Sequence, residues 1–278
     1  MPRKRLTQIF PRLLPLRTWQ RRFCFYTRMR LDENRYAEVK SETTLPYQLY
    51  ETSYPLYNRE TGFDMVYQEN KVFNLKLAAA TLDRVVIRPH ETFSFWKLVR
   101  YADRDIPYKD GLTVIDGKLT TAPGGGMCQM SNLLFWMFLH SPLAVAERHS
   151  HAVKDFPEPP SDAPMGVDAT VSEGWLDLKV KNETKMSFQI SIAFDEDRII
   201  GRLLTDQDNG QLYEVVNGET LYYRKNGKVY EEVDVKQKMI LTETGACSSE
   251  KLLYRNKCEI GYPLPDGTDI VEKGSKEK

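Results

Sequence analysis

The amino-acid sequence predicts an α+β fold, in which a mostly antiparallel β-sheet packs against two main helices and is followed by a small C-terminal β-hairpin region. Apolar side chains fill nearly every position of residues 127–139, which is typical of a buried central helix, here one that starts near Cys128. Residues 70–82 repeat apolar side chains with helical period, and much of the chain after residue 144 alternates as strands do. The order of these patterns indicates helices and strands packed around one main core.

Residues 1–60 are predicted to form a basic N-terminal arm and an irregular segment. Residues 1–30 contain nine Lys or Arg and no Asp or Glu, and residues 31–60 are polar with scattered Tyr and Pro. The simpler interpretation is a solvated arm. The alternative is peripheral contact with an anionic membrane, through arginines that flank apolar side chains such as Phe10, Trp19 and Phe23.

Residues 61–205 are predicted to form the core domain. Val72, Leu75, Ala79 and Leu82 share one face of the helix expected at residues 70–82. The apolar helix of residues 127–139 follows three glycines and is ended by a Ser-Pro pair. Strands are predicted at residues 85–87, 92–96, 108–115, 144–152, 167–171 and 175–181, and a hairpin at residues 187–194 and 198–204.

Residues 206–278 are predicted to form a β-rich appendage that ends in a charged tail. Strand patterns occupy residues 211–216, 221–225 and 229–241. The dipeptides Asn217-Gly218 and Asn226-Gly227 are expected to form the hairpin turns between them, because both residues tolerate positive φ.

Composition narrows the class of protein. The 39 basic and 39 acidic residues balance, so no overall charge favours nucleic acid, and we expect no nucleic-acid partner. The basic start lacks the apolar run of a signal peptide, and no stretch approaches the roughly 18 apolar residues of a membrane span. We therefore expect a cytoplasmic protein, with peripheral membrane contact as the alternative. The four cysteines form no CxxC pair and are expected to be free thiols.

The chemistry is expected at the start of the apolar helix. Cys128 falls in the first turn, where unpaired N–H groups and the helix dipole stabilise a thiolate. Gly124, Gly125 and Gly126 permit positive φ or a close approach to a ligand. The same N–H groups could hold an oxyanion, and Gln129 adds an amide donor beside the thiol.

Two histidines and an aspartate complete this candidate site. His149 and His151 lie two residues apart on a predicted strand, so both should face the same way, and either could be the base for Cys128. Asp168 is expected to orient the histidine, with Asp177 as the competing carboxylate. The order Cys, His, Asp along the chain is that of papain-like and transglutaminase-like enzymes, which is an analogy only.

Several short motifs stand in a defined order along the chain. They are NLKLAAA at 74–80, RPHETFSF at 88–95, GGGMCQMS at 124–131, ERHSH at 147–151 and GVDATV at 166–171, with Asp177-Leu178 and Lys181-Asn182 beyond. In this order they resemble the VanW family over roughly residues 70–204. The resemblance implies a cellular context of cell-wall metabolism and glycopeptide resistance, and it defines no reaction. His90 departs from the family pattern, which usually has glycine at this position.

Three hypotheses follow. The first is a thiol enzyme of cell-wall peptides, either an acyltransferase or an amidohydrolase, that uses Cys128, a histidine and Asp168 without a cofactor. The second is a non-catalytic module that binds a wall precursor or a partner protein at the glycine-rich helix start, where Arg148 could bind a carboxylate. The third is a zinc site formed by Cys128, His149 and His151, although no further ligand stands at a clear spacing.

Overall fold

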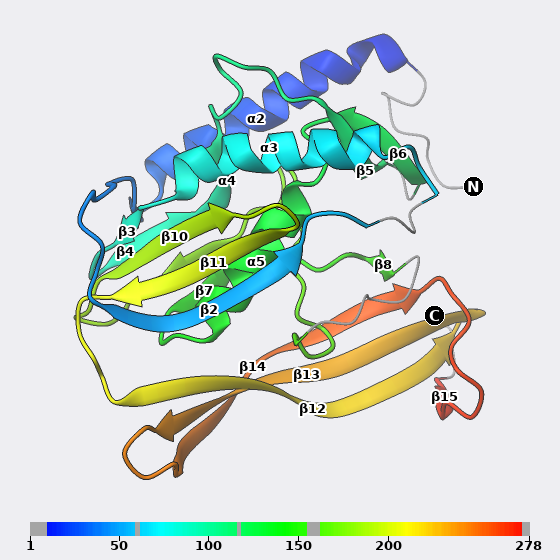
Figure 1. Ribbon diagram of the computed structural model, residues 1–278. Coiled ribbons are helices and arrows are strands. Elements are labelled where there is room, and N and C mark those ends of the chain that lie inside the picture. Colours follow the sequence, from blue (N-terminus) through cyan, green and yellow to red (C-terminus); the bar gives the residue numbers. More distant parts are fainter. Residues whose placement is uncertain (1–9, 59–61, 116–117, 155–161, 274–278) are drawn as a thin grey trace.

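The computed structural model describes residues 10–58, 62–115, 118–154 and 162–273. It confirms the α+β class, with helices packed on mostly antiparallel sheets (Figure 1). None of the helices in these ranges combines the length and apolarity needed to cross a membrane. The helices of the described residues are η1 (Pro11–Leu13), α2 (Leu14–Leu31), α3 (Val66–Leu82), α4 (Phe95–Val99) and α5 (Met127–Leu139).

The strands of the described residues form three sheets and a separate hairpin. The first sheet orders β1 (Arg35–Tyr36), β4 (Glu91–Ser94), β9 (Lys179–Lys181) and β7 (Ala144–Glu147). The second orders β2 (Tyr47–Pro55), β11 (Arg198–Thr205), β10 (Phe188–Phe194) and β3 (Val86–Ile87). The third orders β15 (Ile270–Glu272), β12 (Gln211–Lys225), β13 (Lys228–Leu241), β14 (Cys247–Ile260) and β8 (Val153–Lys154), and β5 (Asp110–Ile115) pairs with β6 (Lys118–Pro123).

Helix α5 lies at the centre of the core and has the predicted bounds. Its apolar side chains are buried on nearly all sides, as the sequence pattern requires. Strand β11 crosses it closely at Gly201, where an added Cβ would overlap the side chain of Met137. Burial of each large side chain contributes roughly 1.5–3 kcal/mol, so the core holds α5 firmly in place.

Helix α3 begins four residues earlier than predicted, and its predicted apolar face is buried. Two polar side chains, Gln68 and Asn74, are buried on it as well. The Asn74 amide accepts from the N–H of Lys109 (2.8 Å) and donates to the carbonyls of Lys109 (2.9 Å) and Gly125 (3.1 Å). Asn74 therefore attaches the glycine loop before α5 to α3.

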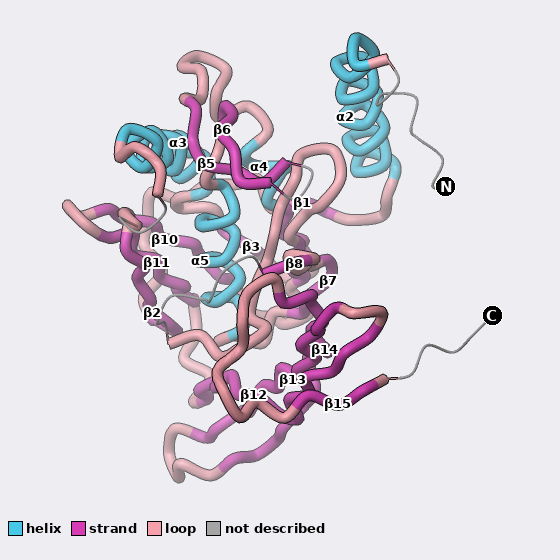
Figure 2. The backbone as a smooth tube through the Cα atoms, turned by 90° about the vertical axis from the view of Figure 1, so that its right-hand side faces the viewer, coloured by secondary structure: helices cyan, strands magenta, loops and turns pink. Residues whose placement is uncertain are grey.

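Two predictions for the first 60 residues were wrong. The basic arm forms the 18-residue helix α2, which starts with a proline in its first turn, where a missing N–H is harmless. The segment predicted as irregular contains β2, the edge strand beside β11. Figure 2 shows α2 apart from the other helices.

Four strand predictions in the core were also wrong in whole or in part. Residues 92–96 divide between β4 and α4, because the Ser94 side chain accepts the N–H of Lys97 and starts the helix. The strand expected at residues 144–152 ends at Glu147, and residues 167–171 form no strand. Only the last part of the segment 175–181 is extended, as β9.

The C-terminal sheet confirms one predicted turn and not the other. Asn226 and Gly227 adopt φ of 52° and 75° between β12 and β13, as a tight hairpin requires. Asn217-Gly218 lies inside the continuous strand β12, at a bulge where the register with β13 shifts. Part of the predicted tail pairs with β12 as β15. The boundaries between the predicted domains remain predictions.

Candidate active site at the start of helix α5

The site begins with the backbone before α5. Gly126 adopts φ of 100°, which glycine reaches without strain, and Cys128 is the second residue of the helix. A Cβ on Gly125 would overlap the backbone of Gly111 in β5, and one on Gly126 would overlap the side chain of Lys71. Packing and conformation thus both require glycine here, and they place the thiol on a rigid turn.

The Cys128 thiol, which is partly buried, faces a loop that carries Thr170. Cys128 Sγ lies 3.3 Å from Thr170 Oγ1 and 3.9 Å from the carbonyl of Val171. Thr170 Oγ1 lies in turn 3.2 Å from Nε2 of His151. The threonine hydroxyl therefore connects the thiol to the imidazole.

Asp168 holds the opposite side of the same imidazole. Nδ1 of His151 lies 2.9 and 3.0 Å from the two carboxylate oxygens of Asp168, and the His151 backbone N–H donates to one of them (2.6 Å). The Asp168 side chain is 12% exposed and that of His151 is 41% exposed. The carboxylate is thus shielded, and the imidazole remains reachable from solvent.

Arg148 holds the backbone segment that carries Asp168. Its guanidinium donates to the carbonyls of Asp168 (2.5 Å) and Gly166 (3.2 Å) and to the side chain of Asn256 in β14 (2.8 Å). It also lies over the ring of Tyr254, 4.3 Å from the centroid. The structure therefore commits Arg148 to holding the Asp168 segment, whereas the sequence suggested a carboxylate-binding role.

Three other predicted or competing residues point elsewhere. His149 Nε2 lies 3.0 Å from the carboxylate of Glu147, because the strand that should align the two histidines ends before them. The Gln129 amide donates to the carbonyl of Pro55 (2.7 Å). Asp177 is buried beneath α4, where it accepts from Ser94 Oγ (2.6 Å), and burial raises its pKa to about 6.

The electrostatics favour a charged pair. Burial raises the pKa of Cys128, but hydrogen bonds with His151 and Thr170 outweigh it and hold that pKa below its ordinary value. Hydrogen bonds to Asp168 and Cys128 raise the pKa of His151 to about 10. Burial likewise opposes ionisation of Asp168, yet hydrogen bonds from His151 leave its pKa lowered. These shifts favour the charged pair, a thiolate at Cys128 and an imidazolium at His151.

Within the described ranges, no three His, Cys, Asp or Glu side chains gather in a way that could hold a metal ion. His149 is turned to Glu147, so Cys128, His149 and His151 do not converge on one point. The structure does not bring together the ligands of the zinc hypothesis.

Sequence reasoning missed three residues around the site. Thr170 belongs to the segment 167–171, which was predicted to be a strand and forms none. Lys71 crosses Gly126, and burial lowers its pKa to about 8. The ring of Tyr108 lies against Gly124, and among the described residues its buried hydroxyl has no hydrogen-bond partner. An apolar helical face and a tyrosine in a strand pattern carry no signal of such placement.

The fold and the site together define an α+β protein with a cysteine, histidine and aspartate cluster at the start of a buried helix. The chain belongs to the VanW family. The family model described as VanW like protein matches residues 70–204. The chain is 58% identical over 272 residues to the vancomycin B-type resistance protein VanW of Enterococcus faecalis, which covers 98% of this chain and 99% of that protein.

A second relative is more distant. The uncharacterized protein YoaR of Bacillus subtilis is 35% identical over 115 residues, which are 41% of this chain and 36% of that protein. No solved structure matches the chain. Membership of the family confirms the resemblance on which the sequence analysis relied.

Proposed function

We propose that this protein is a cysteine-dependent acyltransferase or amidohydrolase that acts on a peptide or cell-wall precursor, in an accessory role in vancomycin resistance. The resistance context comes from the printed name of the Enterococcus faecalis relative. The reaction is inferred from one observation, the continuous contact of Cys128, Thr170, His151 and Asp168. Nucleophile, proton carrier and orienting carboxylate stand in the order that covalent acyl transfer needs.

The first step of this reaction is attack by the thiolate. Cys128 Sγ bonds to the carbonyl carbon of an amide, whose oxygen becomes an oxyanion. The N–H groups of Met127 and Cys128 have no carbonyl one turn back within the helix and could donate to that oxygen. The Gln129 side chain is engaged with Pro55 and is not needed for this role.

Collapse of the intermediate requires a proton. The imidazolium of His151 gives its proton to the departing amine, and a thioester with Cys128 and a neutral imidazole remain. Water or an acceptor amine then attacks the thioester, loses its proton to His151 and releases Cys128 as thiolate. Asp168 keeps the imidazole oriented throughout.

We further propose Lys71 as the cation that binds a carboxylate on the substrate. The side chain of Lys71 lies against Gly126, two residues before the cysteine. Among the described residues its ammonium has no ion-pair or hydrogen-bond partner. With its pKa at about 8, Lys71 is mostly charged at neutral pH, which suits a peptide with a free carboxylate.

The test is the rate at which iodoacetamide modifies Cys128 between about pH 4 and 9, followed by mass spectrometry of the Cys128 peptide. A free thiol has a pKa of about 8.5, and we expect reaction to titrate below that value. His151→Ala should remove the shift, because the imidazolium that stabilises the thiolate is lost. His149→Ala is the matched control and should leave it unchanged, since His149 contacts Glu147.

Two outcomes would contradict the enzyme proposal. One is labelling of Cys128 only after denaturation, which would favour a non-catalytic binding module. The other is equal rates in the two histidine variants. The pH dependence of turnover tests the role of His151 independently. Above a pH of about 10, turnover should fall because His151 loses its proton. Alkylation needs only the thiolate and should continue.

A further inference from the structure

Helix α2 contacts the body through Arg21, whose guanidinium lies 4.3 Å from the centroid of the Trp175 ring, and through side chains further along the helix. Tyr26 and Met29 are buried, and the Tyr26 hydroxyl donates to Glu173 (2.9 Å). Arg22 forms an ion pair with the same carboxylate (2.5 Å). None of residues 14–20 is buried, and Figure 2 shows this end of α2 beyond the body.

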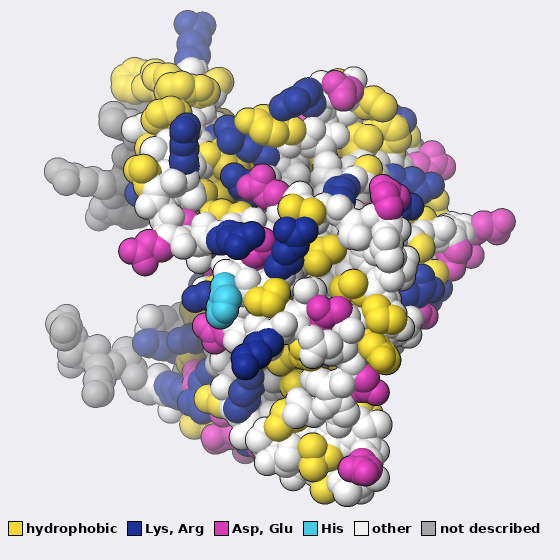
Figure 3. Space-filling model, turned by 90° about the vertical axis from the view of Figure 1, so that its left-hand side faces the viewer, with side chains coloured by type: hydrophobic (Ala, Val, Ile, Leu, Met, Phe, Trp, Pro, Cys, Tyr) yellow, Lys and Arg dark blue, Asp and Glu magenta, His cyan; other side chains and the backbone are white. Residues whose placement is uncertain are grey.

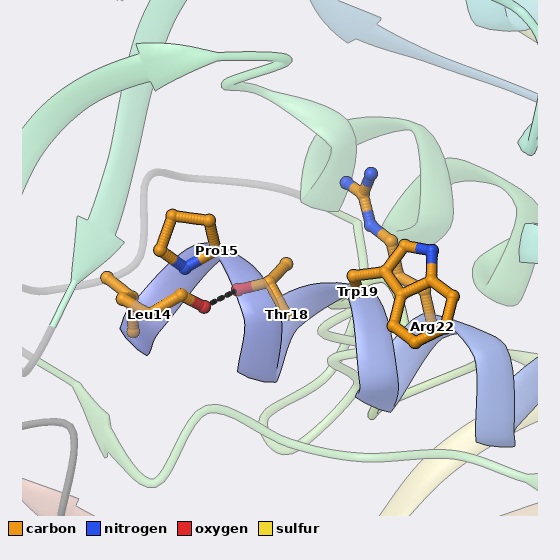
Figure 4. A pocket seen from close by; sticks show the side chains of 5 residues that line it. All are labelled: Leu14, Pro15, Thr18, Trp19 and Arg22. Carbon is orange, nitrogen blue, oxygen red and sulfur yellow. Dashed lines mark hydrogen bonds between the residues drawn. The ribbon is translucent and has the colours of Figure 1, made fainter. Parts of the chain in front are cut away.

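Exposed apolar side chains lie along one face of the helix. Leu16, Trp19 and Phe23 follow one another at helical spacing, with 63%, 63% and 58% of their surface exposed. The rings of Trp19 and Phe23 stack with centroids 5.6 Å apart. Large exposed apolar patches on soluble proteins mark contact sites. An open hollow of about 420 Å³ lies along the same helix, lined by Leu14, Pro15, Thr18, Trp19 and Arg22 (Figure 4).

Positive charge accompanies this patch. Arg17, Arg21 and Arg28 lie on the helix face opposite the apolar residues, by the 3.6-residue turn of an α-helix. Residues 1–30 contain nine basic and no acidic residues, and the remaining 248 residues contain 30 basic and 39 acidic ones. Figure 3 shows apolar and basic side chains together where α2 projects, at the upper left.

We propose that α2 lies in the surface of an anionic membrane and attaches the protein to it peripherally. An apolar face with Trp, Phe and Leu and a polar face of arginines is the composition of interfacial helices, and the absence of acidic residues favours anionic lipid. A second copy is a poor occupant, because two α2 helices would bring arginines together with no acidic partner. Nucleic acid would leave the apolar face uncovered.

This attachment also places the candidate active site. Thr170 and Val171 contact the thiol, and Glu173, which holds α2, follows Val171 by two residues. A membrane-bound α2 would therefore keep Cys128 near the bilayer and favour substrates carried on lipid. That consequence rests on the proposed function, whereas membrane binding rests only on α2.

The test is flotation of the whole protein with vesicles of phosphatidylcholine alone and of phosphatidylcholine mixed with phosphatidylglycerol, at low and high salt. We expect binding to the anionic vesicles only, weakened by salt. Leu16→Ser/Trp19→Ser/Phe23→Ser should abolish it, and Arg17→Gln/Arg28→Gln should weaken it by roughly fivefold per charge. Leu212→Ser/Leu252→Ser, at exposed apolar positions of the C-terminal sheet, is the matched control and should bind as the parent does.

Three results would overturn the proposal. They are absence of flotation at low salt, equal binding to both vesicle types, and unchanged binding of the triple serine variant. A dimer in sedimentation that the triple variant loses would identify a second copy as the occupant. Alkylation of Cys128 in the triple variant reports separately on the thiol site. Failure of the membrane proposal can therefore be told apart from failure of the enzyme proposal.

Discussion

At the scale of single residues, the hydroxyl of Thr170 is the contact that the proposed chemistry depends on most directly. It stands between Cys128 Sγ (3.3 Å) and His151 Nε2 (3.2 Å) and can donate to the thiolate while it accepts from the imidazolium. Thr170→Val keeps the shape and removes the hydroxyl. Since hydrogen bonds to charged groups contribute about 1.5–3 kcal/mol, we expect Cys128 alkylation near neutral pH to slow about tenfold or more.

The control for this variant is Thr170→Ser, which keeps the hydroxyl and should react at close to the parental rate. The measurement is the pH dependence of alkylation, in which the valine variant should titrate at higher pH. Equal curves for the valine and serine variants would mean that the thiol and the imidazole interact without the threonine.

The residues of the site could be predicted in part. A cysteine after three glycines and before an apolar run indicates a helix start, so Cys128 was identifiable from sequence. The choice between His149 and His151 was not, because strand alternation governs facing only within a strand and β7 ends at Glu147. His90 stands where the family usually has glycine. It adopts φ of 65°, so the histidine keeps the positive φ that a glycine would adopt.

At the scale of elements, the contact between the glycine loop and β5 fixes where α5 begins. The backbone carbonyl of Gly111 lies where a Cβ on Gly125 would stand, and backbone moves less readily than a flexible side chain. Gly125→Ala should therefore lower the free energy of unfolding by about 1–3 kcal/mol, which is typical of overpacking. Denaturant unfolding of the purified protein measures the change.

The matched control is Gly218→Ala, in which the new Cβ would stand 2.7 Å from the end of the Lys236 side chain and 3.1 Å from Asp234 Cβ, with no backbone atom among its nearest neighbours. Lysine can move aside, so we expect a small change. Similar losses in the two variants would show that the glycine loop adapts to a side chain. The alanine at residue 125 should also slow Cys128 alkylation if the thiol depends on the position of this turn.

Prediction of elements succeeded where one local signal dominated. The bounds of α5 followed from an apolar run between glycine and Ser-Pro, and the β10–β11 hairpin followed from alternation on both sides of an acidic turn. Helix α2 was missed because a proline and several arginines interrupt its apolar residues, of which only Tyr26 and Met29 are buried. The Thr170 loop was predicted to be a strand because alternation alone cannot reveal that Arg148 binds the backbone carbonyls of Gly166 and Asp168.

At the scale of the whole molecule, the C-terminal sheet takes part in the core. Val233 and Val235 are fully buried, and a Cβ on Gly166 would stand 2.6 Å from Val233 Cγ1. Asn256 of β14 binds Arg148, which holds the segment of Asp168. The sheet that sequence patterning described as an appendage therefore supports the candidate site, and the two parts should unfold together.

A substitution at Gln237 of β13 tests whether the C-terminal sheet and α5 unfold together. Its amide, 4% exposed, donates to the carbonyls of Leu139 (2.6 Å) and Ser141 (2.9 Å), and so satisfies the last turn of α5. Gln237→Leu leaves both carbonyls buried without this donor, at about 1–3 kcal/mol for each. We expect one unfolding transition at a Tm lowered by several degrees, with Trp fluorescence and far-ultraviolet circular dichroism changing together.

The control is Gln207→Leu, at an exposed position, which should leave the Tm within about a degree, since surface changes alter stability by only ±0.5 kcal/mol. Two separate transitions in the Gln237 variant would show that the C-terminal sheet unfolds independently of α5. If Cys128 became reactive to alkylation before the sheet lost its structure, this would likewise show that the two parts unfold independently. A single transition in both readouts means that the sheet, α5 and the cysteine site are stabilised as one unit.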